Sequence, residues 1–201
     1  MAVPAVDPSD ETLAALAAAG DDRAFESLVS RYDARVFRLA CRLTSETDAP
    51  DVLQETFLQV YRHLASFRHE SRFSTWLYRI ATNAALMHRR ARSRRPSESL
   101  DDFLPRFDAD GVHAGTPAEL QLASRADELI DKKVLAERAR SVLARLPDMY
   151  RDPFVLRDLE GMSTAEVAET LDLDPAAVRQ RVHRARLMLR GYLSNLVGVK
   201  P

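Results

Sequence analysis

The chain has 201 residues, of which 46% are hydrophobic, enough for one large or two small domains with buried cores. Its net charge of −1 argues against a uniformly basic nucleic-acid-binding surface, and its one cysteine, Cys41, excludes a disulfide framework. The N-terminal stretch is acidic where a signal peptide is basic, and the apolar run 13–19 is too short to span a bilayer. We therefore expect a cytoplasmic protein without membrane insertion.

The first 95 residues carry the pattern of amphipathic helices. A short helix is expected over 11–19, followed by a longer one that Asp21 or Asp22 opens. The longer helix is predicted because apolar residues recur every three or four positions from Phe25 to Leu43.

Two further helices are expected in this half. Asp48 is predicted to cap the third helix, with Pro50 tolerated in its first turn. The predicted buried face of that helix consists of Val52, Leu53, Phe57, Val60, Tyr61 and Leu64. After a break at 66–74, a fourth helix is expected to run from Trp76 past Met87 toward Arg95.

Charge is strongly partitioned along the chain. Residues 67–95 hold eight arginines against one acid, Glu70, whereas residues 98–119 hold six acids against one base, Arg106. Prolines, glycines and small polar residues also gather in 96–119. We therefore expect this stretch to be a flexible acidic linker between a domain at 1–95 and a domain at 120–201.

The second domain is also expected to be helical. Helical patterning resumes near Leu120 and continues to Pro147, and a short helix that contains Pro153 should end at Gly161. No segment shows the two-residue alternation of a β-strand. The predicted fold class is all-α, with two small helical domains.

The stretch 163–190 has the pattern of a helix-turn-helix. Ser163 and Glu166 form a capping box that starts one helix, and Pro175 behind Asp174 starts a second. In a helix docked in the major groove, Arg179 and Gln180 are placed to contact bases.

Other side chains of this unit are assigned to DNA as well. Arg181, Arg184 and Arg186 are better placed for phosphates, and Ser163 and Thr164 at the start of the first helix complete the expected set. The alternative is a solvated basic face on an ordinary helical hairpin.

Aromatic and basic residues interleave from Phe67 to Arg79, a mixture that suits unpaired nucleic acid because bases stack on rings while arginines follow the backbone. The residues expected to take part are Phe67, Arg68, Phe73, Trp76, Arg79 and Asn83. The alternative for Phe73 and Trp76 is a place in the core, and that for Asn83 is simple solvation.

A polar helix face in the same half is open to two interpretations. Asp51, Gln54, Glu55 and Gln59 follow one side of the predicted third helix. They form either a docking site for a protein or a solvated acidic face, and composition alone favours solvation.

Taken together, these segments resemble the extracytoplasmic-function (ECF) sigma factors, the compact two-domain branch of the bacterial sigma-70 family. Region 2.2 is similar to DAPDVLQETFLQVYR, regions 2.3 and 2.4 are similar to SFRHESRFSTWLYRIATNAALMHRRARSRR, and region 4 is similar to LPDMYRDPFVLRDLEGMSTAEVAETLDLDPAAVRQRVHRARLMLR. The resemblance covers nearly the whole chain.

The resemblance implies a role for each surface. The helix face around Asp51 would dock on the largest-subunit coiled coil of core RNA polymerase, and the 67–83 surface would capture the minus-10 promoter element as an unpaired strand. The positions that match minus-35 readers are Arg179, Gln180, His183 and Arg184. An anti-sigma factor is implied as a further partner.

The turn of the helix-turn-helix departs from the family pattern. LDLDPAAVRQR replaces the commoner Gly-Thr or Gly-Ala before the valine, and Gln180 stands where Ser is frequent. The base preference at minus-35 therefore does not follow from the resemblance, and a glutamine could bond adenine in a bidentate manner.

Two other classes of function are weighed. A helix-turn-helix regulator that acts without core polymerase requires a sensor fold, but the first half shows no α/β pattern. An enzyme is disfavoured because the five histidines show no HExxH-type spacing and no Gly-rich phosphate loop is present. We expect no catalytic residues, no metal and no cofactor.

Overall fold

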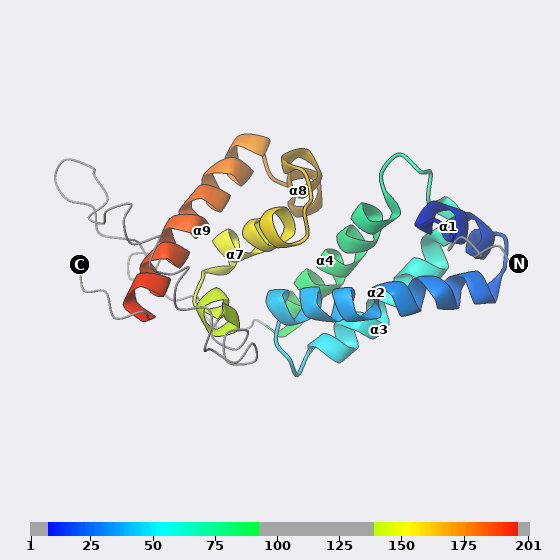
Figure 1. Ribbon diagram of the computed structural model, residues 1–201, viewed down its shortest axis with the longest axis horizontal. Helices are drawn as coiled ribbons and strands as arrows, with labels where there is room; N and C mark the ends of the chain where they lie inside the picture. Colours follow the sequence, from blue (N-terminus) through cyan, green and yellow to red (C-terminus); the bar gives the residue numbers. More distant parts are fainter. Residues whose placement is uncertain (1–7, 93–138, 197–201) are drawn as a thin grey trace, which may run out of the picture.

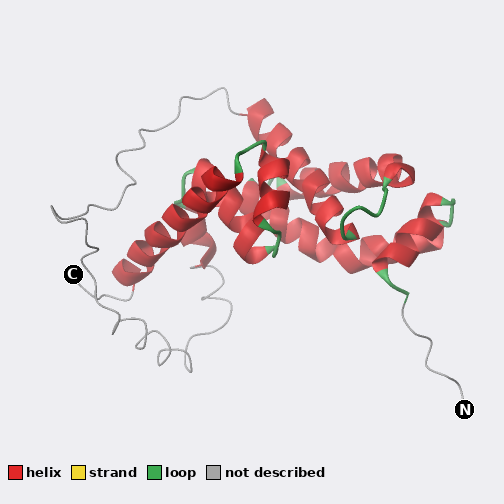
Figure 2. Ribbon diagram, turned by 90° about the horizontal axis from the view of Figure 1, so that it is seen from above, coloured by secondary structure: helices red, strands yellow, loops and turns green. Residues whose placement is uncertain are grey.

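The computed structural model describes residues 8–92 and 139–196, and within these ranges every regular element is a helix (Figures 1 and 2). The N-terminal half contains α1 (Asp10–Ala18), α2 (Asp22–Leu43), α3 (Ala49–His63), a 3-10 turn (Leu64–Ser66) and α4 (Phe73–Arg92). The predicted linker at 96–119 and the predicted helical stretch at 120–138 lie outside the described residues.

The long helix α2 organises the N-terminal half. The Asp21 carboxylate accepts hydrogen bonds from the backbone N–H groups of Arg23 and Ala24 at 3.0 and 3.2 Å, which starts the helix as expected. The apolar stripe of α2 is buried against α1, α3 and α4. Its buried members are Ala24, Leu28, Tyr32, Val36, Leu39, Ala40 and Leu43.

The structure corrects three sequence-based predictions in this half. Tyr61 is 60% exposed, so it does not belong to the buried face of its helix. Asp48 occupies the N-cap position of α3 but makes no capping hydrogen bond, because its carboxylate is held by Ser45 and Arg92. The fourth helix begins at Phe73, before the end of the predicted break, and the Phe73 side chain is buried in the core.

The C-terminal half follows the predicted order. Residues 139–144 are helical and precede α7 (Asp148–Phe154), which passes into a π-helical turn (Val155–Leu159), then α8 (Thr164–Leu171) and α9 (Pro175–Leu196). Pro153 lacks an N–H group and cannot continue the α-helical ladder. The π-helical turn begins two residues later and ends where the Glu160 N–H donates to the Val155 carbonyl at 3.0 Å.

The turn between α8 and α9 bears out its expected start signals. Ser163 Oγ accepts from the Glu166 N–H at 3.2 Å, and the Glu166 carboxylate accepts from the Ser163 N–H at 2.7 Å, which completes the capping box. Asp172 ends α8 in the left-handed conformation at φ 53°, which is uncommon for a residue other than glycine. Asp174 then accepts from the Ala176 N–H at 2.6 Å and starts α9.

The two halves are packed against each other, which the sequence did not predict. One continuous cluster of buried apolar side chains includes Leu39 and Leu43 of α2 together with Val155 and Leu156 of the π-helical turn. Helix α8 lies beside α4 (Figure 1). The surface of the N-terminal half is therefore partly covered by its own C-terminal half.

The buried stripe of α2 should dominate the stability of the N-terminal half. Leu39→Ala removes a completely buried side chain and should lower the free energy of unfolding by about 2–5 kcal/mol. The same truncation at Leu58, which is 42% exposed, should cost less than about 1 kcal/mol. Urea denaturation followed by circular dichroism measures both, and equal losses at the two positions would contradict this packing.

Stability at acid pH should depend on the capping box. Burial raises the pKa of Glu166, but hydrogen bonds with Ser163 and Thr75 and the charge of Arg72 outweigh it, so this pKa lies below its usual value. A depressed carboxyl pKa adds stability above the unfolded-state pKa, which is lost as the pH falls through the folded-state value.

Glu166→Gln keeps a capping side chain but removes the charge. Between about pH 5 and pH 3, the unfolding free energy of the wild type should therefore fall more steeply than that of the variant. Parallel pH profiles in thermal denaturation would refute the role of the charged carboxylate.

Candidate nucleic-acid and polymerase interfaces

Helix α9 presents a basic face to solvent. Val178 and Val182 pack beneath it against Val167 and Ala168 of α8, and this packing fixes the direction of the outer face. The exposed members of the predicted set on α9 are Arg179, Gln180, His183, Arg184 and Arg186, with Arg181 half-buried. The side chains predicted to contact duplex DNA thus lie on one accessible helix.

Some of these side chains already have partners. The Arg186 guanidinium contacts both carboxylate oxygens of Asp158 at 2.7 and 2.8 Å, and this ion pair raises the pKa of Arg186. Arg184 donates to the Tyr150 hydroxyl at 3.3 Å. Among the described residues, Arg179 and Arg181 make no ion pair, which leaves their guanidinium groups available.

The start of α8 is also partly engaged. Thr164 Oγ1 accepts from Arg157 Nε at 3.1 Å, and the Ser163 hydroxyl is used in the capping box. Both residues lie at the N-terminal end of α8, where backbone N–H groups favour an anion. The arrangement fits a phosphate contact better than base reading.

The interleaved segment of the N-terminal half forms an aromatic cluster. The Phe67 ring centroid lies 5.1 Å from that of Trp76 and 5.8 Å from that of Phe73. Phe73 is only 1% exposed and also packs against Tyr32, so it is a core residue and the expectation that it faces nucleic acid is wrong. Phe67 and Trp76 are half-buried at the outer edge of the cluster, where one ring face can remain open.

Polar groups follow the same edge. Arg68 and Asn83 are exposed, whereas Arg79 is half-buried and pairs with Glu169 of α8 at 2.8 Å. Arg79 is therefore the one member of the predicted strand-binding set that carries an ion pair to the other half among the described residues.

The third candidate surface lies on α3. Asp51, Gln54 and Glu55 are exposed, and the Gln59 side-chain amide donates to the Glu55 carboxylate at 2.6 Å. Leu58 and Tyr61 share this face and are exposed, which the sequence analysis missed. Their spacing of seven and ten residues from Asp51 was the available signal, because it places both on the polar side of the helix.

An ion-pair network crosses between the two halves. Arg89 of α4 contacts both carboxylate oxygens of Asp152 in α7, at 3.1 and 2.6 Å, and its Nε lies 3.1 Å from Asp148. Burial lowers the pKa of Arg89, but the hydrogen bonds and charge of Asp152 outweigh it and leave that pKa above its usual value. The Arg89 guanidinium is therefore charged at the contact between the two halves.

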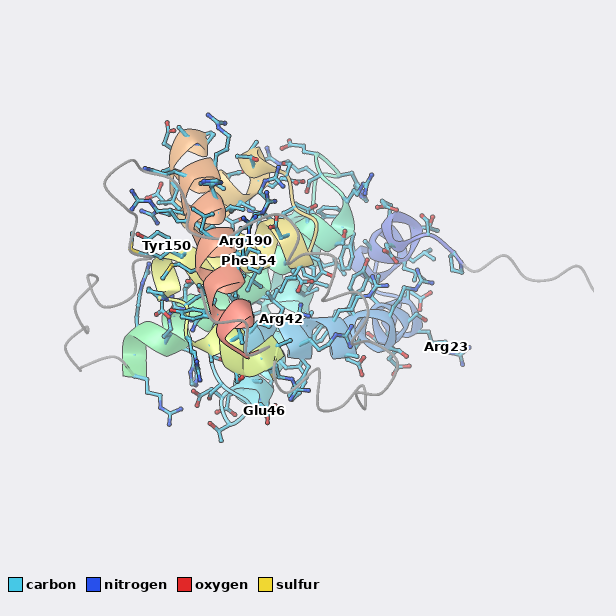
Figure 3. The ribbon with its side chains drawn as sticks, turned by 60° about the vertical axis from the view of Figure 1, so that its left-hand side comes forward. Arg23, Arg42, Glu46, Tyr150, Phe154 and Arg190 are labelled. Carbon is cyan, nitrogen blue, oxygen red and sulfur yellow. The ribbon has the colours of Figure 1, made fainter. Side chains whose placement is uncertain are left out.

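A second contact joins Arg42, near the end of α2, to Glu160 at 2.5 Å. Burial raises the pKa of the Glu160 carboxyl, and the opposing effects of Arg42, Arg38 and Arg35 only partly offset it. The contact is thus specific in geometry but carries a desolvation cost. Figure 3 shows Arg42 at the opposite end of α2 from Arg23.

Metal and membrane sites do not emerge from the described ranges. No group of three or more His, Cys, Asp or Glu side chains within 8–92 and 139–196 could hold a metal ion. Within the same ranges, no helix combines the length and apolar character needed to cross a membrane.

Comparison with known proteins identifies the family. The sequence profile of Sigma-70 region 2 matches residues 28–95, and that of Sigma-70 region 4 matches residues 136–189. The ECF RNA polymerase sigma-E factor of Haemophilus influenzae is 37% identical over 189 residues, which are 94% of this chain and 97% of that protein.

Solved structures share the fold. CnrH in complex with the cytosolic domain of CnrY superposes with a TM-score of 0.61 and 31% identity, covering 92% of this chain and 97% of CnrH. The sigma factor RpoE of Bartonella quintana, in complex with the anti-sigma factor NepR, has the same TM-score of 0.61 at 23% identity, covering 85% and 96% of the two chains. The chain belongs to the sigma-70 family and is an ECF RNA polymerase sigma factor.

Proposed function

We propose that this chain binds core RNA polymerase and directs it to promoters by holding the minus-10 and minus-35 elements with separate surfaces. The observation that supports the proposal is the presence of two different exposed surfaces on one chain, an aromatic-edged one at α4 and the basic face of α9 in a helix-turn-helix. Two modest contacts on one chain reinforce each other, because binding of the first promoter element raises the effective concentration of the second element at its own binding surface.

The minus-35 element is assigned to α9. Its N-terminal residues Arg179 and Gln180 are exposed and would contact base edges, while His183 and Arg184 follow one turn later. Arg181 and Arg186 are assigned to phosphates, as are Ser163 and Thr164 at the start of α8. This division separates sequence reading from positioning.

The minus-10 element is assigned to the edge of α4. Phe67 and Trp76 would stack on unpaired bases, which contributes about 1–3 kcal/mol for each base. Arg68 and Arg79 would contact the backbone, and the exposed amide of Asn83 would pair with a base edge. Phe73 supports the other two rings from below. The strand is captured once it opens, and the polymerase performs the chemistry.

Core polymerase is assigned to the outer face of α3. The polar residues Asp51, Gln54, Glu55 and Gln59 surround the exposed apolar pair Leu58 and Tyr61. Apolar anchors within a polar rim are typical of protein docking sites. The solvated-face alternative is less consistent with this apolar pair.

Further aspects of the proposal concern partners and place of action. The chain itself would perform no catalysis and use no cofactor, and it would act in the cytoplasm, where polymerase and promoters are found. An inhibitory protein partner is proposed because CnrH and the Bartonella sigma factor were both solved with a bound protein.

Transcription from purified components separates this function from a regulator that acts without core polymerase. The chain and core polymerase together should yield a promoter-specific run-off transcript that neither yields alone. Asp51→Lys should lower that transcript at least about tenfold, because a reversed charge at a docking site costs about 1.4 kcal/mol or more. Glu26→Lys, the same charge reversal at an exposed position of α2, is the control. Equal effects of the two variants would rule out docking through α3.

Base reading at minus-35 can be tested with two single substitutions on α9. Arg179→Ala should reduce discrimination between a promoter duplex and a scrambled duplex by about 1–3 kcal/mol. Arg181→Ala should instead weaken binding to both duplexes alike, because a phosphate contact carries no sequence information. Competition binding at fixed salt measures the two effects. A uniform loss with Arg179→Ala would remove it from the base-reading set.

A further inference from the structure

Helix α1 carries one carboxylate that bonds to a core residue of α2. Asp10, at the first position of α1, is half-buried and accepts a hydrogen bond from the Tyr32 hydroxyl. Its other carboxylate oxygen contacts the Arg31 guanidinium at 2.6 Å. Both partners lie more than twenty residues away along the chain, so these contacts fix the place of α1 on α2 (Figure 1).

The Tyr32 side chain is held at its ring and at its hydroxyl. The ring is buried, meets the Phe73 ring edge to face at a centroid distance of 5.6 Å, and has the Arg35 guanidinium over it. Burial and the hydrogen bond to Asp10 raise the pKa of Tyr32, so the hydroxyl stays protonated and donates. The Asp10 carboxylate therefore fixes the hydroxyl end of a ring that packs against Phe73.

Phe73 connects Tyr32 to the two rings assigned to unpaired bases. Its ring centroid lies 5.8 Å from that of Phe67 and 5.8 Å from that of Trp76. Asp10 is thus linked to those outer rings by direct contacts throughout, first to Tyr32, then to Phe73. A displacement is passed on through such contacts because protein interiors are close-packed.

Helix α1 reaches the aromatic edge by a second route. It packs against the 3-10 turn Leu64–Ser66 and against α4. The Phe67 N–H donates to the Leu64 carbonyl at 3.1 Å, so the residue that carries one outer ring ends that turn. Helix α1 therefore supports the strand-binding edge both through Tyr32 and through the turn before Phe67.

We propose that Asp10 is a positioning residue for the promoter strand: its hydrogen bond to Tyr32 fixes the ring stack that presents Phe67 and Trp76 to unpaired bases. The proposal rests on the proposed function, since it deepens the minus-10 assignment. It extends that site to α1, which precedes the residues 28–95 matched by the Sigma-70 region 2 profile. Asp10 acts through Tyr32 and not by contact with nucleic acid.

The physical reason is preorganisation. A ring that is already held in its stacking position loses little conformational freedom when a base stacks on it. Without the support of Tyr32, the outer rings would have to be ordered during binding. The affinity for the strand would then fall although both stacking rings are still present.

Charge and positioning predict opposite results when the Asp10 carboxylate is removed. Nucleic acid is an anion, so the loss of a negative charge from the protein raises affinity through charge alone. The loss of ring support lowers it. Asp22→Ala is the matched control, because Asp22 occupies the equivalent first position of α2 but is exposed.

The test uses the full chain and the emission of Trp76, which is its only tryptophan and so reports on this site. Quenching by single-stranded DNA of mixed sequence measures strand affinity, because stacking on rings tolerates any base. Asp10→Ala should bind the strand about 3- to 10-fold more weakly than the wild type, the cost of ordering one side chain. Asp22→Ala should stay within about twofold of the wild type.

Two further variants isolate the hydrogen bond. Tyr32→Phe keeps the ring and removes only the hydroxyl, so it should also weaken strand binding, and it decides the question if Asp10→Ala does not fold. Asp10→Asn keeps an oxygen that can accept from the hydroxyl and should bind within about twofold of the wild type. Equal losses for Asp10→Asn and Asp10→Ala would assign the effect to the ion pair with Arg31 and overturn the role of the hydrogen bond.

Duplex binding separates positioning from a loss of stability. The exposed face of α9 should bind labelled duplex DNA within about twofold equally in all variants, whereas a general loss of folded protein lowers strand and duplex binding together. In the free Asp10→Ala protein, Trp76 emission should move to longer wavelength and acrylamide should quench it more strongly, because the loosened ring is more accessible to water.

The possible failures are distinguishable. Strand binding by the wild type together with unchanged affinity in Asp10→Ala and Tyr32→Phe overturns the positioning role and leaves the minus-10 assignment intact. If the strand does not quench Trp76 in the wild type, the minus-10 assignment fails and the positioning role fails with it.

Discussion

The carboxyl end of α2 is the junction on which the arrangement of this sigma factor depends. The Leu43 carbonyl at this end accepts hydrogen bonds from Arg89 of α4 and from Arg151 of α7, both at 3.1 Å. Positive charge at a helix C-terminus is favourable, and Asp152 holds Arg89 in place with a two-point contact. Because one helix end is satisfied by both halves, the two helical cores meet there and form one continuous apolar cluster.

Because of that junction, the two candidate nucleic-acid surfaces differ in how accessible they are. The α4 edge faces the other half, and Arg79 is taken by Glu169, whereas the outer face of α9 points to solvent. Buried ion pairs provide specific geometry but little net stability, so such a junction can be definite in structure and still open when a stronger partner competes. A two-element promoter reader needs this property, since both surfaces must be delivered together but used at a distance.

Local signals in the sequence were sufficient for most of the helices. The capping box at Ser163 and Glu166, the cap at Asp21 and the apolar stripe of α2 each depend on neighbours within four residues, and all three were confirmed. Phe73 was misplaced because its burial depends on which helices pack against it, and periodicity does not contain that information.

Energy transfer between dyes on the exposed faces of α2 and α9, in a Cys41→Ser background, tests most directly whether the two halves are packed together in the free chain and separate when the chain acts. Transfer should be efficient in the free chain, since the two halves share a core, and should fall when core RNA polymerase is added. Weak transfer in the free chain, or efficient transfer that persists in the complex with polymerase, would contradict this account.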